Sequence, residues 1–197
     1  MALSAQDKIL YVANKLGLTS LKDMQATTGA VFATDNTNPG SGQVFNTVGN
    51  NVYNVETNLS DNRFEVNEAL LVESISFGVN NFGSMSYPVQ YWGSNIVVVF
   101  DLVIGNKTVL KNTPIWLAGG PNTFASVGLR EGAAGNEYIP RAQIFLEGAG
   151  ILIPPQVEFY INYSLYNTTT GAKLSNPRFS QFTLFGTQVL LNFNTSL

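Results

Sequence analysis

The chain has 197 residues, of which 45% are hydrophobic, and this is enough for one domain with a sizeable core. Charged residues make up 12% and the formal net charge is -3, so the overall charge does not favour nucleic-acid binding. Cysteine and histidine are absent, which excludes disulfides, thiol catalysis, a Ser-His-Asp triad and zinc held by cysteine or histidine.

A surface with so few charges is poorly protected against association. We therefore expect copies of the chain or other partners to cover much of it; the alternative is a monomeric β domain with an Asn- and Thr-rich surface. No stretch approaches the roughly 18 apolar residues of a membrane-spanning helix, and the N-terminus lacks a signal-peptide apolar run. We expect synthesis in the cytosol, where the protein stays until it is assembled or released.

Residues 1–28 predict a short helical arm. Ser4 and Asp7 have the spacing of a capping box, and Gly17 is a natural residue to end the helix. Apolar residues at helical spacing lie between these ends: Ile9, Val12, Ala13 and Leu16.

Lysines recur every seven residues along this arm, at Lys8, Lys15 and Lys22. If the helix continued through Gly17, these lysines would form a basic stripe suited to anionic lipid or to packaged nucleic acid. The alternative is that the arm packs on the body of the protein while its lysines are solvated.

Residues 29–62 are rich in Gly, Asn and Thr, so we expect an extended segment that supplies edge strands. Residues 63–79 alternate apolar and polar side chains, which indicates a strand pair or one bent long strand. Acidic residues gather here around Arg63: Glu56, Asp61, Glu65, Glu68 and Glu73. This acidic cluster is a divalent-ion site, a salt-bridge patch between subunits, or simply a solvated surface.

Residues 80–95 predict a long loop whose aromatic residues include Tyr91 and Trp92. Such residues either plug the core or form contacts with another molecule. The next segment, NIVVVFDLVIG, predicts a strand buried on both faces, and the turn after it predicts a hairpin. Trp116 lies on the following short strand, and we expect Tyr91, Trp92 and Trp116 to lie at contacts between subunits.

Residues 141–167 are the stretch around which we expect the chain to be organised. RAQIFLE alternates, with Ile144 on one face and Phe145 on the other; a glycine turn and an apolar run follow. QVEFYINYSLY then predicts a long strand with one apolar face: Val157, Phe159, Ile161, Tyr163 and Leu165. A strand of this length needs partners on both edges and a second sheet over its apolar face. Residues 178–193 predict two more strands, RFSQFTLFG and TQVLLNF.

The pattern predicts about eight main strands from residue 63 onward and no helix beyond the arm, which is typical of an all-β sandwich or barrel. Long connections at 80–95 and 122–140 favour a jelly roll over a meander. We therefore expect an N-terminal helical arm (1–28), an extended edge-strand segment (29–62) and a single jelly-roll domain (63–197).

Three segments carry a resemblance to a known family: NLSDNRFEVNEAL, GNKTVLKNTPIWLAGG and ILIPPQVEF. In their order and residue pattern they resemble the capsid jelly rolls of tailless icosahedral bacteriophages, most of all those of the membrane-containing phages that infect Flavobacterium. The resemblance covers about residues 58–167 and includes no catalytic signature. Capsid proteins of this lineage often carry two jelly rolls, whereas this chain fits one.

The resemblance implies a major, minor or penton capsid subunit that is made in the host cytoplasm and assembles into an icosahedral virion shell. It implies contacts with other copies and other capsid proteins. It also puts the arm on the inner side of the shell, where Lys8, Lys15 and Lys22 would meet an internal lipid membrane or the genome.

Two other classes of function stay open from the residues. Jelly rolls also bind carbohydrates or receptors, and Tyr91 and Trp92 would then stack on a sugar. An enzyme without His or Cys would need a carboxylate pair, and the acids of residues 56–73 have no reason to converge on a cleft. We expect a structural protein, not an enzyme, with no metal or cofactor.

Overall fold

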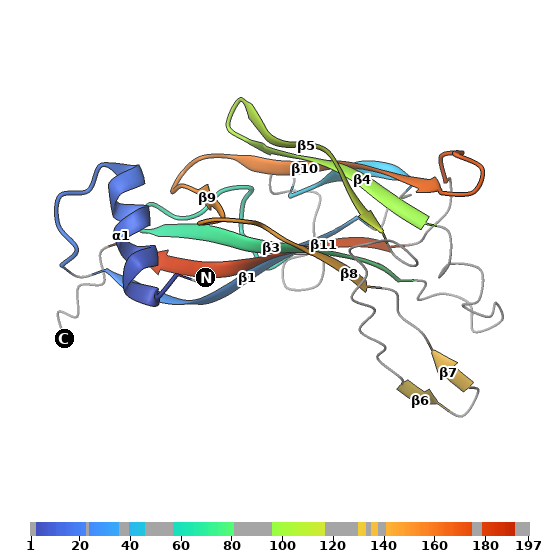
Figure 1. The fold of residues 1–197 in the computed structure, drawn as a ribbon, viewed down its shortest axis with the longest axis horizontal. Helices are drawn as coiled ribbons and strands as arrows, with labels where there is room; N and C mark the ends of the chain where they lie inside the picture. The colour runs from blue at the N-terminus through green and yellow to red at the C-terminus, as the bar shows by residue number, and fades with distance from the viewer. Residues whose placement is uncertain are drawn as a thin grey trace.

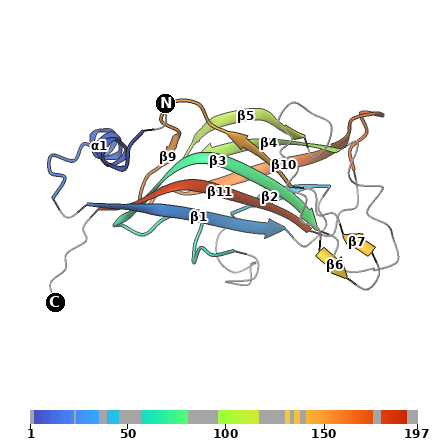
Figure 2. The same cartoon turned by 60° about the horizontal axis from the view of Figure 1, so that its bottom comes forward.

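The computed structural model describes residues 3–22, 24–35, 40–45, 57–80, 96–116, 130–132, 135–137, 141–174 and 179–191. Over these ranges the protein consists mostly of β-strands, in two antiparallel sheets that face each other, with the helix α1 (Ala5–Leu16) at one end (Figures 1 and 2). The predicted all-β class with a short N-terminal helix is therefore confirmed. No helix in the described ranges is long and apolar enough to cross a membrane.

Sheet A has the strand order β1-β11-β3-β8, and β9 pairs with β3 on the same side as β8. Its strands are β1 (Gln25–Asp35), β3 (Glu68–Asn80), β8 (Arg141–Phe145), β9 (Ile151–Ile153) and β11 (Phe179–Leu190). Sheet B has the order β2-β10-β4-β5. Its strands are β2 (Ser41–Val44), β4 (Ile96–Ile104), β5 (Lys107–Trp116) and β10 (Phe159–Asn167). A separate ribbon pairs β6 (Arg130–Gly132) with β7 (Gly135–Glu137).

The strand pairs are nested along the chain. With β8 and β9 counted as one interrupted strand, β1 pairs with β11, β2 with β10, β3 with β8–β9, and β4 with β5. The pairs β11–β3 and β10–β4 join these ladders into the two sheets. Nine strands of the described residues, β3 to β11, begin after residue 63, close to the predicted count of about eight, and the two sheets also include β1 and β2 from the segment before it.

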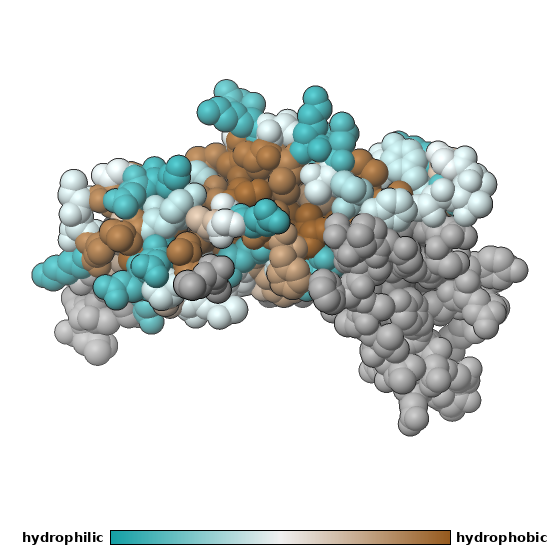
Figure 3. Space-filling view, in the orientation of Figure 1, coloured by the Kyte–Doolittle hydropathy of each residue, from teal (hydrophilic) through white to brown (hydrophobic). Residues whose placement is uncertain are grey.

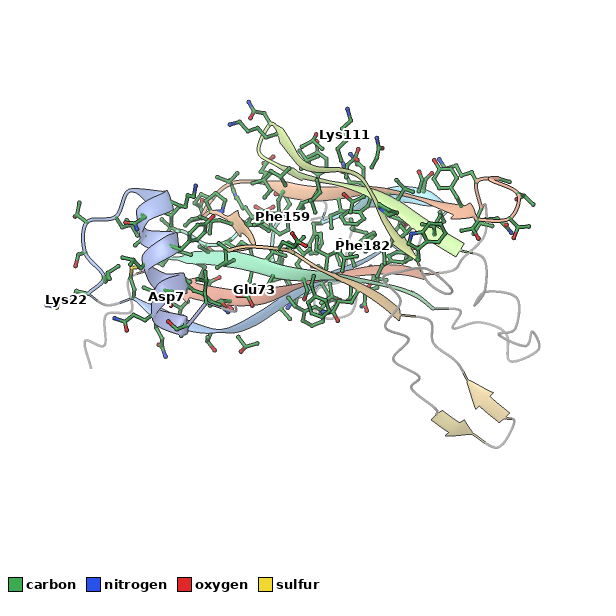
Figure 4. The ribbon with its side chains drawn as sticks, in the orientation of Figure 1. Asp7, Lys22, Glu73, Lys111, Phe159 and Phe182 are labelled. Atoms are coloured by element: carbon green, nitrogen blue, oxygen red, sulfur yellow. The ribbon has the colours of Figure 1, made fainter. Side chains whose placement is uncertain are left out.

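The inner faces of the sheets meet in a core dominated by aromatic rings. Phe182 of sheet A lies 4.7 Å from Phe77 of its own sheet and 5.5 Å from both Phe100 and Tyr163 of sheet B, measured between ring centroids. A second group joins Phe159 to Phe45 and Phe64. Figure 4 shows Phe159 and Phe182 between the sheets. The predicted buried face of β10 is confirmed for its four described strand positions: Phe159, Ile161, Tyr163 and Leu165.

The C-terminal segment forms one long strand, so the prediction of two strands at residues 178–193 was wrong. The pairing of β11 with β3 shifts register between Phe185 and Gly186. A Cβ atom on Gly186 would collide with the carbonyl oxygen of Leu71, so only glycine lets the two strands approach here. On β3 the same bulge puts the consecutive residues Glu73 and Ser74 on the outer side of sheet A, where Glu73 contacts Lys8 and Ser74 contacts Gln143.

A polar contact crosses the core between the sheets. The hydroxyl of Tyr163, on sheet B, donates a hydrogen bond of 2.9 Å to the carboxylate of Asp35, on sheet A. Burial raises the pKa of Tyr163 above its ordinary value; a hydrogen bond with Ser180 opposes this rise, and the charge of Asp35 adds to it. The phenol therefore stays protonated and satisfied inside an apolar core.

Replacement of Phe182 tests whether the ring cluster holds the sheets together. Because Phe182 is fully buried, Phe182→Ala should lower the free energy of unfolding by about 3–5 kcal/mol. The matched control is Phe185→Ala on the same strand, where the ring points outward and is 38% exposed, with an expected cost below about 1 kcal/mol. Urea denaturation measures both; equal losses would contradict a core role for Phe182.

The Tyr163 hydroxyl should make stability depend on alkaline pH. A folded-state pKa above the unfolded value of about 10 contributes stability that is fully present below pH 10 and is lost as the pH rises further. The advantage of the wild type over Tyr163→Phe should therefore shrink above pH 10, by up to about 1.4 kcal/mol per pH unit. Denaturation curves between pH 8 and pH 11, roughly the range around the ordinary tyrosine pKa, measure this difference; a constant difference would contradict it.

Candidate interaction surfaces

Helix α1 begins and ends as the sequence predicted. The Ser4 hydroxyl accepts a hydrogen bond from the Asp7 amide, the Asp7 carboxylate accepts one from the Ser4 amide, and Gly17 adopts a left-handed conformation. Hydrogen bonds from the side chain and then the backbone of Ser4 lower the pKa of Asp7. The helix therefore stops at Leu16 and does not continue into the next segment.

The helix packs on the outer face of sheet A, at one end. Val12 joins Ala69, Leu71 and Val189 in a small buried cluster that is separate from the main core. Figure 2 shows α1 beside the ends of β1, β3 and β11. A hydrophobic stripe on the helix thus covers apolar side chains that would otherwise face solvent.

Lys8 fixes this helix to the sheet. Its ammonium group forms an ion pair with Glu73 and donates a hydrogen bond of 3.1 Å to the hydroxyl of Thr187, which donates one of 3.0 Å to Glu73. The side chain of Lys8 is 18% exposed, so this Lys8–Glu73–Thr187 network is partly shielded from water. The β3 bulge makes it possible, because it turns Glu73 outward.

The condition for a basic stripe, a helix that continues through Gly17, is not met. Lys8 faces sheet A, Lys15 lies 5.7 Å above the ring of Tyr11, and Lys22 comes after the helix has ended. In Figure 4, Lys22 lies beyond the helix, away from both sheets. The glycine cap breaks the helical phase on which the stripe depended, so the three lysines do not share one face.

Trp116 belongs to a row of side chains on the outer face of sheet B. Tyr166, Val97 and Trp116 are opposite one another on β10, β4 and β5. Their neighbours Leu165, Val98 and Ile115 are fully buried in the core, so by strand alternation this aromatic row points outward. Val97 is nevertheless only 8% exposed, while both rings are half-buried.

Polar side chains cross the same face in a second row. The Gln43 amide donates to Asn162 at 2.9 Å, Asn162 is opposite Asp101, and Asp101 accepts a hydrogen bond of 2.6 Å from the backbone of Asn112. Asn112 has a φ of 49°, so the carboxylate holds a strained residue where β4 and β5 change register. Sheet B thus presents both aromatic and hydrogen-bonding groups outward.

A third surface lies where β5 of sheet B faces β8 and β9 of sheet A. Figure 3 shows hydrophobic side chains gathered in the middle of this side. Leu110, Leu146 and Ile151 are partly buried against the core, and Val109 is 42% exposed. We call these residues the open side, because here the core reaches the surface between two sheet edges.

The acidic cluster does not converge in the described residues. Asp61 forms an ion pair of 3.1 Å with Arg63, and Glu73 pairs with Lys8. No group of three or more acidic residues suited to a metal ion occurs in the described ranges, and Glu56 lies outside them. A polar hollow of about 280 Å³ is lined by Ser60, Asp61, Arg63, Phe64, Glu65 and Gln156.

Of the residues predicted at contacts, the structure describes Trp116 and the three lysines, whereas Tyr91 and Trp92 lie outside the described residues. Sequence reasoning did not single out Tyr166 or Thr187. The outward alternation of β10 was a usable signal for Tyr166. Thr187 had none, because its role depends on its position opposite Leu71 and beside Lys8, residues far away in the sequence.

Comparisons with protein-family models, with curated proteins and with solved structures find no match to this chain. The fold and these surfaces are therefore the features that bear on function.

Lys8→Met should loosen α1, because it leaves Glu73 and Thr187 without their cation. The network is partly shielded, so its energy should lie between that of an exposed ion pair and that of a buried one. We expect the free energy that holds α1 on sheet A to fall by about 1–2 kcal/mol. Exchange of the α1 amides should then quicken about tenfold, as 1.4 kcal/mol requires. Lys15→Met is the matched control, with exposed Lys15 on the same helix; equal exchange in the two variants would contradict the network's role.

Proposed function

We propose that this protein is a structural subunit of a viral capsid, built on a single jelly roll, that associates with other copies of itself into an icosahedral shell. It would be made in the host cytoplasm and reside in the virion. Its partners would be other copies and other capsid proteins.

The nested strand pairing is the observation that carries the proposal. A jelly roll is one long antiparallel hairpin that rolls up, so its first strand pairs with its eighth, its second with its seventh, its third with its sixth and its fourth with its fifth. The pairs β1–β11, β2–β10, β3–β8/β9 and β4–β5 follow this order, and β11–β3 and β10–β4 are the contacts made on rolling. Viral capsid domains are a major use of this architecture.

Fold alone does not assign function, so the surfaces matter as well. Shell assembly needs apolar and aromatic contact area more than a reactive centre. The aromatic row and the open side supply such area on a chain in which 12% of residues are charged. An arm contact with lipid or nucleic acid would depend on Lys15 and Lys22, because Lys8 is engaged with Glu73.

Trp116→Ala and Val109→Asp test this proposal. Both side chains reach the surface, so the fold should survive, but each change removes or charges a proposed contact. If either residue is central to an interface, the concentration needed for assembly should rise about 30-fold, as a loss of 2 kcal/mol requires. Light scattering and negative-stain electron microscopy measure it. Lys111→Ala is the control on the same strand, an exposed lysine that extends from the β5 hairpin (Figure 4).

A wild-type chain that stays monomeric at high concentration, alone and with the other proteins of its particle, would overturn the proposal. If the folded variants assemble at the same concentration as the wild type, the aromatic row and the open side are not contacts between subunits.

The outer face of sheet B also favours a second candidate function, carbohydrate or receptor binding. Trp116 and Tyr166 offer rings for stacking, and the row of Gln43, Asn162 and Asp101 offers hydrogen-bonding groups on the same face. A glycan array distinguishes the two: glycan binding that Trp116→Ala abolishes, in a wild-type chain that does not assemble, would favour this alternative.

A further inference from the structure

Strand β1 forms one edge of sheet A, so on one of its sides no other strand of the described residues pairs with it. Edge strands offer backbone N–H and C=O groups to which a strand from another molecule can add. With 11 residues β1 is longer than β2, the corresponding edge of sheet B, which has four. Its sequence, QATTGAVFATD, has no proline and no charge before Asp35, as is typical of segments that pair with copies of themselves.

The side chain of Asn58 closes the middle of this edge. Its Oδ1 accepts a hydrogen bond of 2.8 Å from the amide of Phe32, and its Nδ2 donates one of 2.8 Å to the carbonyl of Ala30. These two backbone groups lie on either side of Val31, whose side chain is buried in the core. An added strand, parallel or antiparallel, would have to bond to the same outward C=O and N–H groups, so the Asn58 amide stands where that strand would lie.

The neighbouring residue extends the closure, because Thr57 forms an antiparallel bridge with Ala33. The Asn58 side chain itself uses both its acceptor and its donor on the β1 edge, through the hydrogen bonds to Phe32 and Ala30.

The other edges are protected by different means in the part of the chain that the structure describes. β2 is short, and β8 and β9 are separated by a turn. β5 carries exposed Lys107, exposed Lys111 and Pro114, and its pairing with β4 shifts register twice. Lysine, proline, bulges and short length all hinder strand addition, whereas the long β1 edge relies on a side chain.

We propose that Asn58 is an edge guard, which keeps β1 of one copy from pairing with β1 of a second copy. The second β1 is the partner that fits, because two identical edges can pair antiparallel about a twofold axis. Self-association is thereby directed to surfaces other than the sheet edge. This inference rests on the hydrogen bonds of Asn58 and holds whether or not the chain forms a capsid.

The test compares Asn58→Leu with Asn167→Leu in the full chain. Leucine keeps the size of asparagine but removes its amide. Asn167 is the control because its side chain also makes two backbone hydrogen bonds, both accepted by Oδ1 from the amides of Thr169 and Thr170, at a turn away from the β1 edge. We expect Asn58→Leu to form thioflavin-positive, β-paired species at about tenfold lower concentration than the wild type, and Asn167→Leu to behave as the wild type.

Hydrogen exchange identifies the edge that is used. The amide of Phe32 should exchange faster in monomeric Asn58→Leu than in the wild type, and become protected again in the associated species. Thioflavin-positive association without protection of this amide would overturn the proposal. Equal thioflavin-positive association of the two leucine variants, or a folded Asn58→Leu that forms none beyond the wild type, would overturn it as well.

Asn58→Asp shows whether aggregation comes from the unguarded edge or from a loss of stability. It also provides a test if Asn58→Leu does not fold. Aspartate loses the bond to Ala30 but puts a charge on the edge, which itself hinders strand addition. It should form no more thioflavin-positive species than the wild type, and aggregation of Asn58→Asp through β1 would overturn the proposal. Shell formation by the wild type is a separate readout, so failure of the capsid proposal would be recognised independently.

Discussion

The two sheets are held together by aromatic rings that neither sheet could bury alone. Facing sheets lie roughly 10 Å apart, so large side chains from both inner faces must interdigitate to fill the space. Phe182 does this between Phe77 of its own sheet and Phe100 and Tyr163 of the other. Because Tyr163 brings a hydroxyl into this core, Asp35 has to lie at the end of β1, where its carboxylate can accept the phenolic hydrogen.

The inner faces of both sheets are closely packed, but their outer faces differ from each other. On sheet A the register shift at Gly186 turns Glu73 outward, and α1 covers the apolar side chains next to it through Val12 and Lys8. On sheet B no described helix covers the outer face, and the rings of the outward aromatic row are half-buried. The molecule thus has one outer face partly covered by its own helix and another that presents rings and amides.

Local patterns in the sequence predicted what local physics determines. Ser4, Asp7 and Gly17 gave both ends of the helix, and alternation gave the buried face of β10. These patterns failed where contacts with residues distant in the sequence determine the local structure. Gly186 was interpreted as the end of a strand, but the approach of Leu71 makes it the bulge within one strand.

The lysines and the strand order show the same limit. Lys8 was assigned to a basic stripe for lipid or nucleic acid because nothing near it in the sequence indicates Glu73 as its partner. Strands such as β4 and β10 could be predicted from their own residues. The pairing of β1 with β11 could not, because it joins opposite ends of the chain and the alternation of either strand is compatible with many partners. Loop residues such as Asn58 are harder still, because an asparagine before a strand suits any turn, and only the folded sheet shows that its amide meets Ala30 and Phe32. A chain with closed sheet edges and open apolar faces can associate in a defined geometry, since side chains on a face fix register and angle, whereas a free edge would accept any strand.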